Sequence, residues 1–216
     1  MYIIINLKIF LFAVIFLLTH QIKIYSCIMI FSFIHELGHM FTGIILKLKP
    51  KTLKIMPFGI SIAFEDYTYK ELMELKKIII AFAGPLTNIL IIVIIYFLNL
   101  NPDLKELSIY SNTLIAIFNL IPIYPLDGGR ILKGILRLKL NKEKSDDIIN
   151  KISNIVIFLL TAIASIIVLY IKNIAILFII IYLWIIIIKE NKKYQLKKRM
   201  YKILQNDYKK TKYIDI

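Results

Sequence analysis

Blocks of apolar residues, each close to twenty residues long, dominate this chain of 216 residues. About twenty consecutive apolar residues cross the hydrocarbon core of a bilayer as an α-helix, because each residue adds only about 1.5 Å to its length. We therefore predict an all-α polytopic membrane protein with about six transmembrane helices. The six predicted spans are Tyr2–Leu18, Ile24–Leu46, Ile78–Leu98, Ile109–Leu136, Ile152–Ile171 and Asn173–Ile188.

These spans leave no room for a sizeable soluble domain. We expect a six-span domain over residues 1–188 and a basic cytoplasmic tail over residues 189–216. The first block contains Lys8 and has no small-residue cleavage site after Leu18, so we interpret it as a retained helix rather than a signal peptide. The single cysteine, Cys27, excludes a disulfide framework.

The net charge of +14 follows the predicted topology. The segments after the second, fourth and sixth spans (47–77, 133–151 and 189–216) hold 7, 6 and 10 lysines or arginines, whereas the intervening segments hold one each. Because basic loops stay in the cytoplasm, we predict a multi-pass cell-membrane protein with both termini cytoplasmic. We expect the tail to contact the anionic lipid bilayer and not nucleic acid, since no recognition fold accompanies its charge.

The segment LKIMPFGISIAF, residues 53–64, differs from the spans around it. It is too short to cross a bilayer as a helix, it contains Pro57 and Gly59, and its side chains partly alternate in polarity. This pattern predicts a short re-entrant β segment at the cytoplasmic face. Residues 65–77 are then expected to form a short surface helix before the third span.

Three ionisable side chains, His35, Glu36 and His39, lie within five residues of the second predicted span. Each such group at membrane depth costs roughly 2.5 to 3.5 kcal/mol on insertion scales, so a compensating partner is expected. Residues four apart on a helix differ by only about 40° around its axis, so the two imidazoles point to one side and can bind one metal ion. Glu36 would then stand beside that ion.

Asp127 is the candidate for a third ligand. Prolines 122 and 125 and glycines 128 and 129 break the fourth predicted span, and Asp127 lies at the break. A catalytic zinc takes three protein ligands and leaves a fourth position for water, and an aspartate completes a set with two histidines. We predict a metal site formed by His35, His39 and Asp127. The preference for zinc over iron or cobalt rests on ligand type and on the resemblance described next.

The motif HELGH at 35–39, together with NLIPIYPLDGG at 119–129, resembles the site-2 intramembrane zinc metalloproteases, peptidase family M50. The resemblance covers roughly residues 1–188, and the compact six-span layout is similar to the stage IV sporulation protease branch of that family. Longer relatives carry a pair of nucleotide-sensing CBS motifs. Only 28 residues follow the last predicted span here, so we expect neither that domain nor a PDZ-sized insertion.

The resemblance implies a role for several positions. His35, His39 and Asp127 match the zinc ligands, and Glu36 matches the catalytic glutamate. Asn119 and Pro125 match positions that form the cleft and hold substrate. The stretch AGPLTN, 83–88, matches a small-residue element beside the site, and residues 53–64 resemble a hairpin that aligns substrate. Apart from the resemblance, Asn88 or Asn119 would bind substrate and stabilise the oxyanion, or either side chain would instead form a hydrogen bond between helices, and the residues do not choose among these roles.

The predicted function is hydrolysis of a peptide bond in a membrane-tethered protein substrate, a pro-sigma factor or a similar regulator. Inhibitory membrane proteins are expected as further partners. A metal-ion transporter is the alternative, because His, Glu and Asp in spanning helices also suit a conducted cation. Its path would need polar residues along several spans, and the last two spans are almost purely apolar. An inactive scaffold should have lost Glu36 or a ligand, and none is lost.

Overall fold

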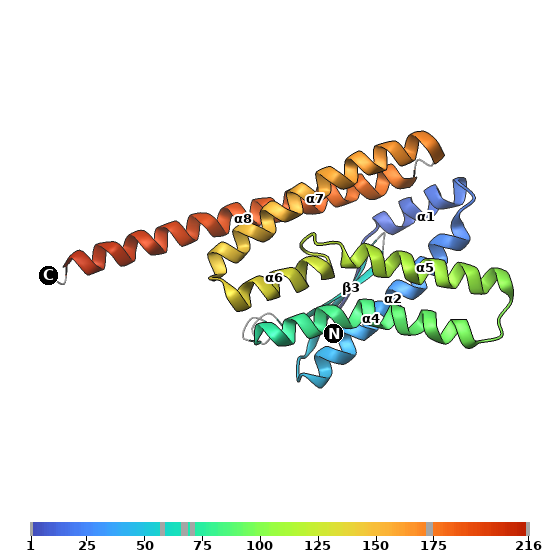
Figure 1. Cartoon of the computed structure of the whole chain (residues 1–216), viewed down its shortest axis with the longest axis horizontal. Coiled ribbons are helices and arrows are strands. Elements are labelled where there is room, and N and C mark those ends of the chain that lie inside the picture. The colour runs from blue at the N-terminus through green and yellow to red at the C-terminus, as the bar shows by residue number, and fades with distance from the viewer. Residues whose placement is uncertain (1, 57–58, 66–68, 70–71, 172–174, 215–216) are drawn as a thin grey trace.

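The computed structural model describes residues 2–56, 59–65, 69, 72–171 and 175–214. Over these residues the fold is mostly helical, with one small sheet (Figure 1). Its elements in chain order are β1 (Tyr2–Ile5), α1 (Lys8–Leu18), α2 (Ile22–Ile45), β2 (Pro50–Met56), β3 (Gly59–Phe64), α4 (Glu74–Phe97), α5 (Pro102–Leu120), α6 (Asp127–Lys139), α7 (Lys142–Ile171) and α8 (Ala175–Ile214).

Three helices in the described part of the chain are long and apolar enough to cross a membrane. These are α2, α4 and the stretch Lys142–Tyr170 of α7. Helix α1 has only 11 residues, the first turns of α5 carry three charged residues, and α8 runs on into the basic tail. The protein is therefore a membrane protein with at least these three apolar helices, and the six-span layout stays a prediction.

The prediction of helix over the whole first block was wrong at its start. Tyr2–Ile5 forms strand β1, which pairs in parallel with β2 from Tyr2 opposite Thr52 to Ile5 opposite Ile55. A short apolar run rich in isoleucine suits a strand as well as a buried helix, because β-branched side chains pack well on a pleated surface. The partner strand decides between them here.

The β structure predicted for residues 53–64 is confirmed in the described residues as an antiparallel pair, β2 and β3, and its re-entrant position at the cytoplasmic face stays a prediction. With β1 it makes a three-stranded sheet in the order β1-β2-β3. Leu53 and Ile62 lie opposite each other and are buried against Leu48, Phe64 and Ile80 of α4. The sheet packs mainly against α2, and this cluster adds a contact with Ile80 of α4. Residues 66–68, 70 and 71 of the predicted surface helix at 65–77 lie outside the described residues, and its last four residues belong to α4, which begins at Glu74.

The fourth predicted span is two helices. Helix α5 begins at Pro102, preceded by Asn101, whose side chain accepts a hydrogen bond from the Asp103 N–H at 3.0 Å. The helix ends at Leu120, so the predicted break at the prolines is confirmed. Asp127, however, is the first residue of α6 and does not lie in unwound chain. Its carboxylate is therefore at the positive end of a helix dipole.

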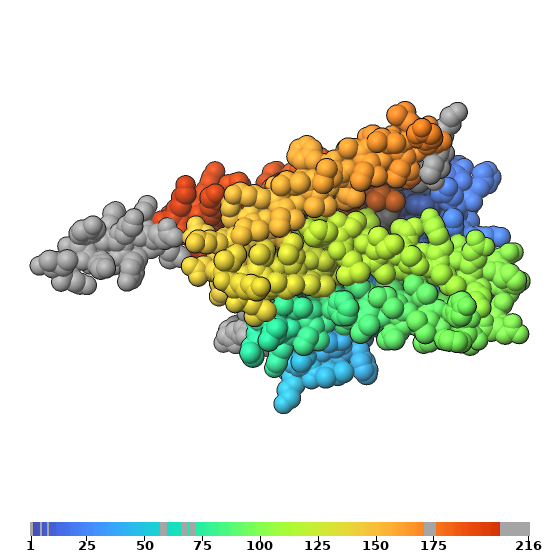
Figure 2. Space-filling view, in the orientation of Figure 1, coloured from blue at the N-terminus to red at the C-terminus, as the bar shows by residue number. Residues whose placement is uncertain are grey.

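Helices α7 and α8 lie side by side, and α8 extends beyond the rest of the molecule (Figures 1 and 2). Ile157 of α7 and Leu183 and Ile187 of α8 form a buried apolar cluster with Ile123. The pairing continues past residue 188, because Asn191 Nδ2 donates to Asn154 Oδ1 at 2.9 Å. The expected boundary between residues 188 and 189 thus falls within one continuous helix.

Asp146 joins the last three helices. It is 4% exposed, and its carboxylate lies 2.9 Å from Arg137 Nη2 and 3.1 Å from Lys133 Nζ, both on α6. The other oxygen is 2.7 Å from Lys197 Nζ on α8. One carboxylate on α7 therefore forms ion pairs with three cations, two on α6 and one on α8.

Replacing Asp146 with asparagine should destabilise this junction. The change keeps the side-chain shape but leaves three cations without their shared anion, and charged hydrogen bonds contribute about 1.5–3 kcal/mol each. We expect a lower unfolding midpoint in detergent, measured by thermal melting. Asp147→Asn is the control, because that side chain is 33% exposed against 4% for Asp146 and its loss should change the midpoint less. Equal midpoints for the two variants would contradict this role.

Candidate metal centre

Two histidines of α2 and an aspartate of α6 converge on one point. His35 and His39 are one helical turn apart and only 2% and 3% exposed, and their Nε2 atoms are 3.1 Å apart. Asp127, 4% exposed, places Oδ2 3.0 Å from His35 Nε2 and 3.1 Å from His39 Nε2. The structure therefore brings the three predicted ligands together in a buried cluster that could hold a metal ion.

The hydrogen bonds of the two imidazoles fit this use. His39 Nδ1 lies 2.6 Å from the carbonyl oxygen of Ile80, and His35 Nδ1 contacts Asn88 Oδ1. Both partners are oxygens that only accept, so each Nδ1 carries a proton, and in the neutral imidazole that binds metal each Nε2 directs a lone pair toward Asp127. Three acceptor atoms facing one another repel unless a cation lies among them.

The spacing of these atoms is also suitable. Ligands at about 2.0–2.1 Å around a tetrahedral zinc ion are separated by roughly 3.3 Å. The three separations here are 3.0–3.1 Å, and a small adjustment of the side chains would bring them to that value. The donor set of two imidazoles and one carboxylate is one that zinc uses in catalytic sites.

A buried chain of amides holds His35 in place. Asn88 on α4, fully buried, contacts His35 through Oδ1, and its Nδ2 donates to Asn112 Oδ1 on α5 at 2.7 Å. Asn112 donates in turn to the backbone oxygen of Ser108 at 2.9 Å. Sequence reasoning missed Asn112. The signal was the polar pair Ser111 and Asn112 within an otherwise apolar stretch of α5.

Gly84 lets α4 approach the cluster. A Cβ atom built at Gly84 would overlap Nε2 of both His39 and His35, the two atoms that face Asp127. The next residue, Pro85, lacks an N–H, so the carbonyl of Ala81 loses its helical donor and the helix is weakened there. One carbonyl earlier, Ile80 accepts the bond from His39. The AGPLTN stretch thus supplies the spacing through Gly84 and one imidazole partner, Asn88, while the other partner, the Ile80 carbonyl, precedes it.

Glu36 lies beside the cluster and faces the sheet. Its Oε2 accepts a hydrogen bond from the backbone N–H of Ile62 in β3 at 3.0 Å. Glu36 and His39 both border a cavity of about 720 Å³. Arg130, one turn into α6, has Nη1 3.8 Å from Asp127 Oδ1 and lines the same cavity.

The remaining predicted site residues lie elsewhere or have other contacts. Asn119 is in the last turn of α5, and its side chain donates to the Ile115 carbonyl of its own helix at 3.0 Å. Pro125 lies in the connection between α5 and α6. Asn88 contacts His35, as described above. Substrate roles for these three residues stay predictions.

Gly84→Ala should prevent metal binding. Its new methyl group would occupy space between the two Nε2 atoms, and overpacking of this kind typically costs about 1–3 kcal/mol even where side chains can move. We expect the purified variant to fold but to contain close to background zinc, measured by plasma mass spectrometry.

Gly38→Ala is the matched control. It adds the same methyl group to the same helix pair, but there the added Cβ would meet Thr87 and Ala83 and not the imidazole nitrogens. The change can lower the stability of the protein, but we expect every preparation that can be purified to retain its metal. Equal metal loss in both variants would assign the effect to general packing and contradict a direct obstruction by residue 84.

Comparison with known proteins agrees with this site. Residues 24–102 and 103–163 match Peptidase family M50. The chain is 33% identical over 120 residues to Stage IV sporulation protein FB of Bacillus subtilis, a match that covers 54% of this chain and 41% of that protein. It is 37% identical over 123 residues to Zinc metalloprotease MJ0392 of Methanocaldococcus jannaschii, covering 53% and 34% respectively. The matched part is less than half the length of either relative.

A solved structure shares the fold. The Site-2 Protease from Methanocaldococcus jannaschii superposes with a TM-score of 0.66 at 23% identity, over 87% of this chain and 89% of that one. The family match covers well over half of the residues and includes His35, Glu36, His39 and Asp127. The chain therefore belongs to peptidase family M50.

Proposed function

We propose that this chain is an intramembrane zinc metalloendopeptidase that hydrolyses a peptide bond of a membrane-associated protein. The observation that carries the proposal is the buried cluster of His35, His39 and Asp127, with Glu36 next to it on an apolar helix of spanning length. Family membership supports it, as do the names of a relative, a zinc metalloprotease, and of the similar structure, a site-2 protease.

The chemistry divides between the metal and the chain. Zinc held by His35, His39 and Asp127 would acidify water and polarise the scissile carbonyl. Glu36 takes the proton from the attacking water and returns it to the leaving amine, which is the two-way role of a general acid/base. The cavity of about 720 Å³ beside Glu36 and His39 gives water a route to a site otherwise surrounded by apolar helices.

Within this proposal the chain lies in the cell membrane with both termini in the cytoplasm. The support is the concentration of lysine and arginine after the second, fourth and sixth predicted spans. The substrate is a pro-sigma factor or a similar membrane-tethered regulator. The likeness to a protein named for stage IV of sporulation supports that choice.

Glu36→Gln tests the enzymatic proposal directly. The amide keeps the size of the side chain and all three metal ligands but cannot take a proton, so cleavage should fall by at least about 10²–10⁴-fold. We expect unchanged zinc content and loss of the smaller product when the variant is co-expressed with a tagged sigma-factor precursor. His35→Ala should lose both metal and cleavage.

The same variant separates this function from metal transport. A transporter should show altered zinc flux in proteoliposomes and no peptide product from the wild-type protein. Flux that depends on Glu36 without any cleaved product would therefore contradict the peptidase proposal.

We propose that the substrate backbone pairs with the edge of β3 that faces away from β2. The Ile62 N–H donates to Glu36 and so points away from β2, and by alternation the polar groups of Ile60 point the same way. A peptide bond must be extended to be cleaved, and an extended segment can pair with a strand edge. Pairing at Ile62 would compete with Glu36 for one N–H, so substrate arrival would free the carboxylate beside the scissile bond.

Ile62→Pro tests this pairing. Proline removes the outward N–H, whereas the bonds between β2 and β3 come from neighbouring residues and should persist, because proline is tolerated on strand edges. We expect at least about tenfold slower cleavage with normal zinc content, because the substrate backbone loses a pairing position on the strand edge. Ile62→Val keeps the N–H and should cleave normally. Normal cleavage by the proline variant would end the strand-pairing hypothesis.

A further inference from the structure

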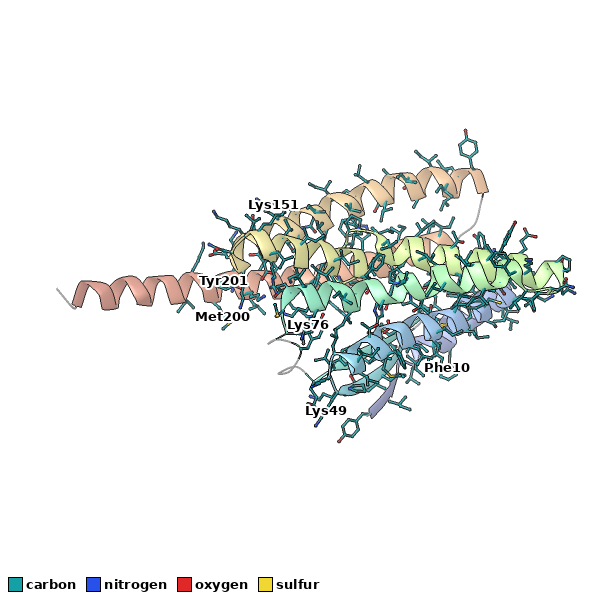
Figure 3. All side chains as sticks on the ribbon, turned by 60° about the horizontal axis from the view of Figure 1, so that its bottom comes forward. Phe10, Lys49, Lys76, Lys151, Met200 and Tyr201 are labelled. Atoms are coloured by element: carbon teal, nitrogen blue, oxygen red, sulfur yellow. The ribbon has the colours of Figure 1, made fainter. Side chains whose placement is uncertain are left out.

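Among the charged residues that line the cavity beside Glu36, basic residues outnumber acidic ones. It extends from Glu36, His39 and β3 along α6 to the start of α7 and to α8. Figure 3 labels Tyr201 of α8, which lines the cavity, and Lys76 of α4, which precedes the lining residue Lys77. Its acidic lining residues are Glu36 and Glu74. Its basic lining residues are Lys77, Arg130, Lys133, Arg137, Lys142 and Lys197.

Local ion pairs neutralise only part of this charge. Glu74 pairs with Lys77 at 3.0 Å and with Arg137 at 3.6 Å. Asp146 does not line the cavity itself, but it forms ion pairs with Lys133, Arg137 and Lys197. Among the described residues, four carboxylates, including that of Asp127, are thus set against six cations. The described part of the lining therefore carries excess positive charge before any metal ion adds its own.

Of the six basic lining residues, Arg130 and Lys142 have the weakest ion pairing with these acidic groups. The acidic neighbour of Arg130 is Asp127 at 3.8 Å, and that carboxylate belongs to the metal cluster. Lys142 is exposed at the first turn of α7, and within the described part of the chain no ion pair within 4.0 Å engages it. Both can bind an incoming anion without breaking an existing close pair.

The cations are arranged along the route that a substrate would take. Arg130, Lys133 and Arg137 repeat at positions i, i+3 and i+7, so they lie on one face of α6 over about 10 Å. An extended chain covers that length in about three residues. The cavity volume of about 720 Å³ is within the range of about 300–1,000 Å³ that holds ligands of peptide size.

We propose that this cavity recognises an acidic segment of the substrate, within a few residues of the scissile bond, and that Arg130 and Lys142 determine the preference. The inference rests on the proposed function and specifies its substrate class. A peptide is favoured over a lipid headgroup because Glu36, His39 and the edge of β3 border the same space. An anion there is therefore next to the groups that would process a peptide bond.

Binding of short peptides tests the preference without requiring cleavage. Three labelled ten-residue peptides would differ only at three central positions, occupied by aspartate, asparagine or lysine. Fluorescence anisotropy with the Glu36→Gln protein, loaded with zinc in an uncharged detergent, should show the aspartate peptide binding at least about tenfold more tightly than the asparagine peptide. The lysine peptide should bind more weakly than either.

Lys142→Glu and Lys144→Glu form the matched pair of variants. Both positions are exposed lysines at the start of α7, both changes alter the net charge equally, and an acidic residue near a helix N-terminus favours folding. Only Lys142 lines the cavity. We expect Lys142→Glu to reduce the ratio of the affinities for the aspartate and asparagine peptides at least about threefold. Lys144→Glu should leave it unchanged.

Several results would overturn the inference. One is equal binding of the aspartate and asparagine peptides, and another is an equal effect of the two lysine variants, which would show a response to net charge alone. Displacement of the aspartate peptide by short-chain phosphatidylglycerol, with lipid binding weakened by Lys142→Glu, would assign the cavity to lipid. Tight, Lys142-dependent binding of the aspartate peptide without cleavage by the wild-type protein would instead support the cavity and reject the peptidase function.

Discussion

The structure depends on the burial of three polar side chains at one point between apolar helices. His35, His39 and Asp127 are each less than 5% exposed, and the hydrogen bonds at both Nδ1 atoms leave only acceptor atoms facing one another. Such an arrangement is unfavourable without a cation, since buried polar groups need partners. A metal ion would link α2 to α6 through these three side chains. The same ion would supply the chemistry, so metal binding and assembly of the site are coupled.

The other elements are arranged around that point. Helix α4 packs against α2, α5 and α6, and it provides Gly84, the Ile80 carbonyl and the Asn88 amide to the imidazoles. The sheet brings the Ile62 N–H to Glu36, and α6 carries Asp127 and the first cations of the cavity. Asp146 then connects α6 to α7 and α8. A cavity with basic residues in its lining and a buried metal cluster are thus adjacent, which is compatible with the proposed hydrolysis of a peptide bond.

Much of the fold and of the site could be predicted from particular residues. The spacing of His35 and His39 places both imidazoles on one side of a helix, and Pro57 and Gly59 indicated the hairpin. The start of the chain could not be predicted in the same way, because the YIII run suits helix or strand until β2 lies beside it. Asp127 was expected in unwound backbone, whereas α6 begins at that residue, because helix starts are set by local geometry after a turn.

Local patterns of the sequence determined the apolar helices, the histidine pair, the break before Asp127 and the positive charge of the chain, because each follows from the periodicity or composition of neighbouring residues. Only the tertiary structure decided that Asn88 and Asn112 support His35, that Glu36 contacts Ile62, and that cations from α4, α6, α7 and α8 surround one cavity. These contacts join residues that are 24 or more positions apart in the chain, or lie on separate helices. No local periodicity relates such residues, since their meeting depends on how whole helices pack.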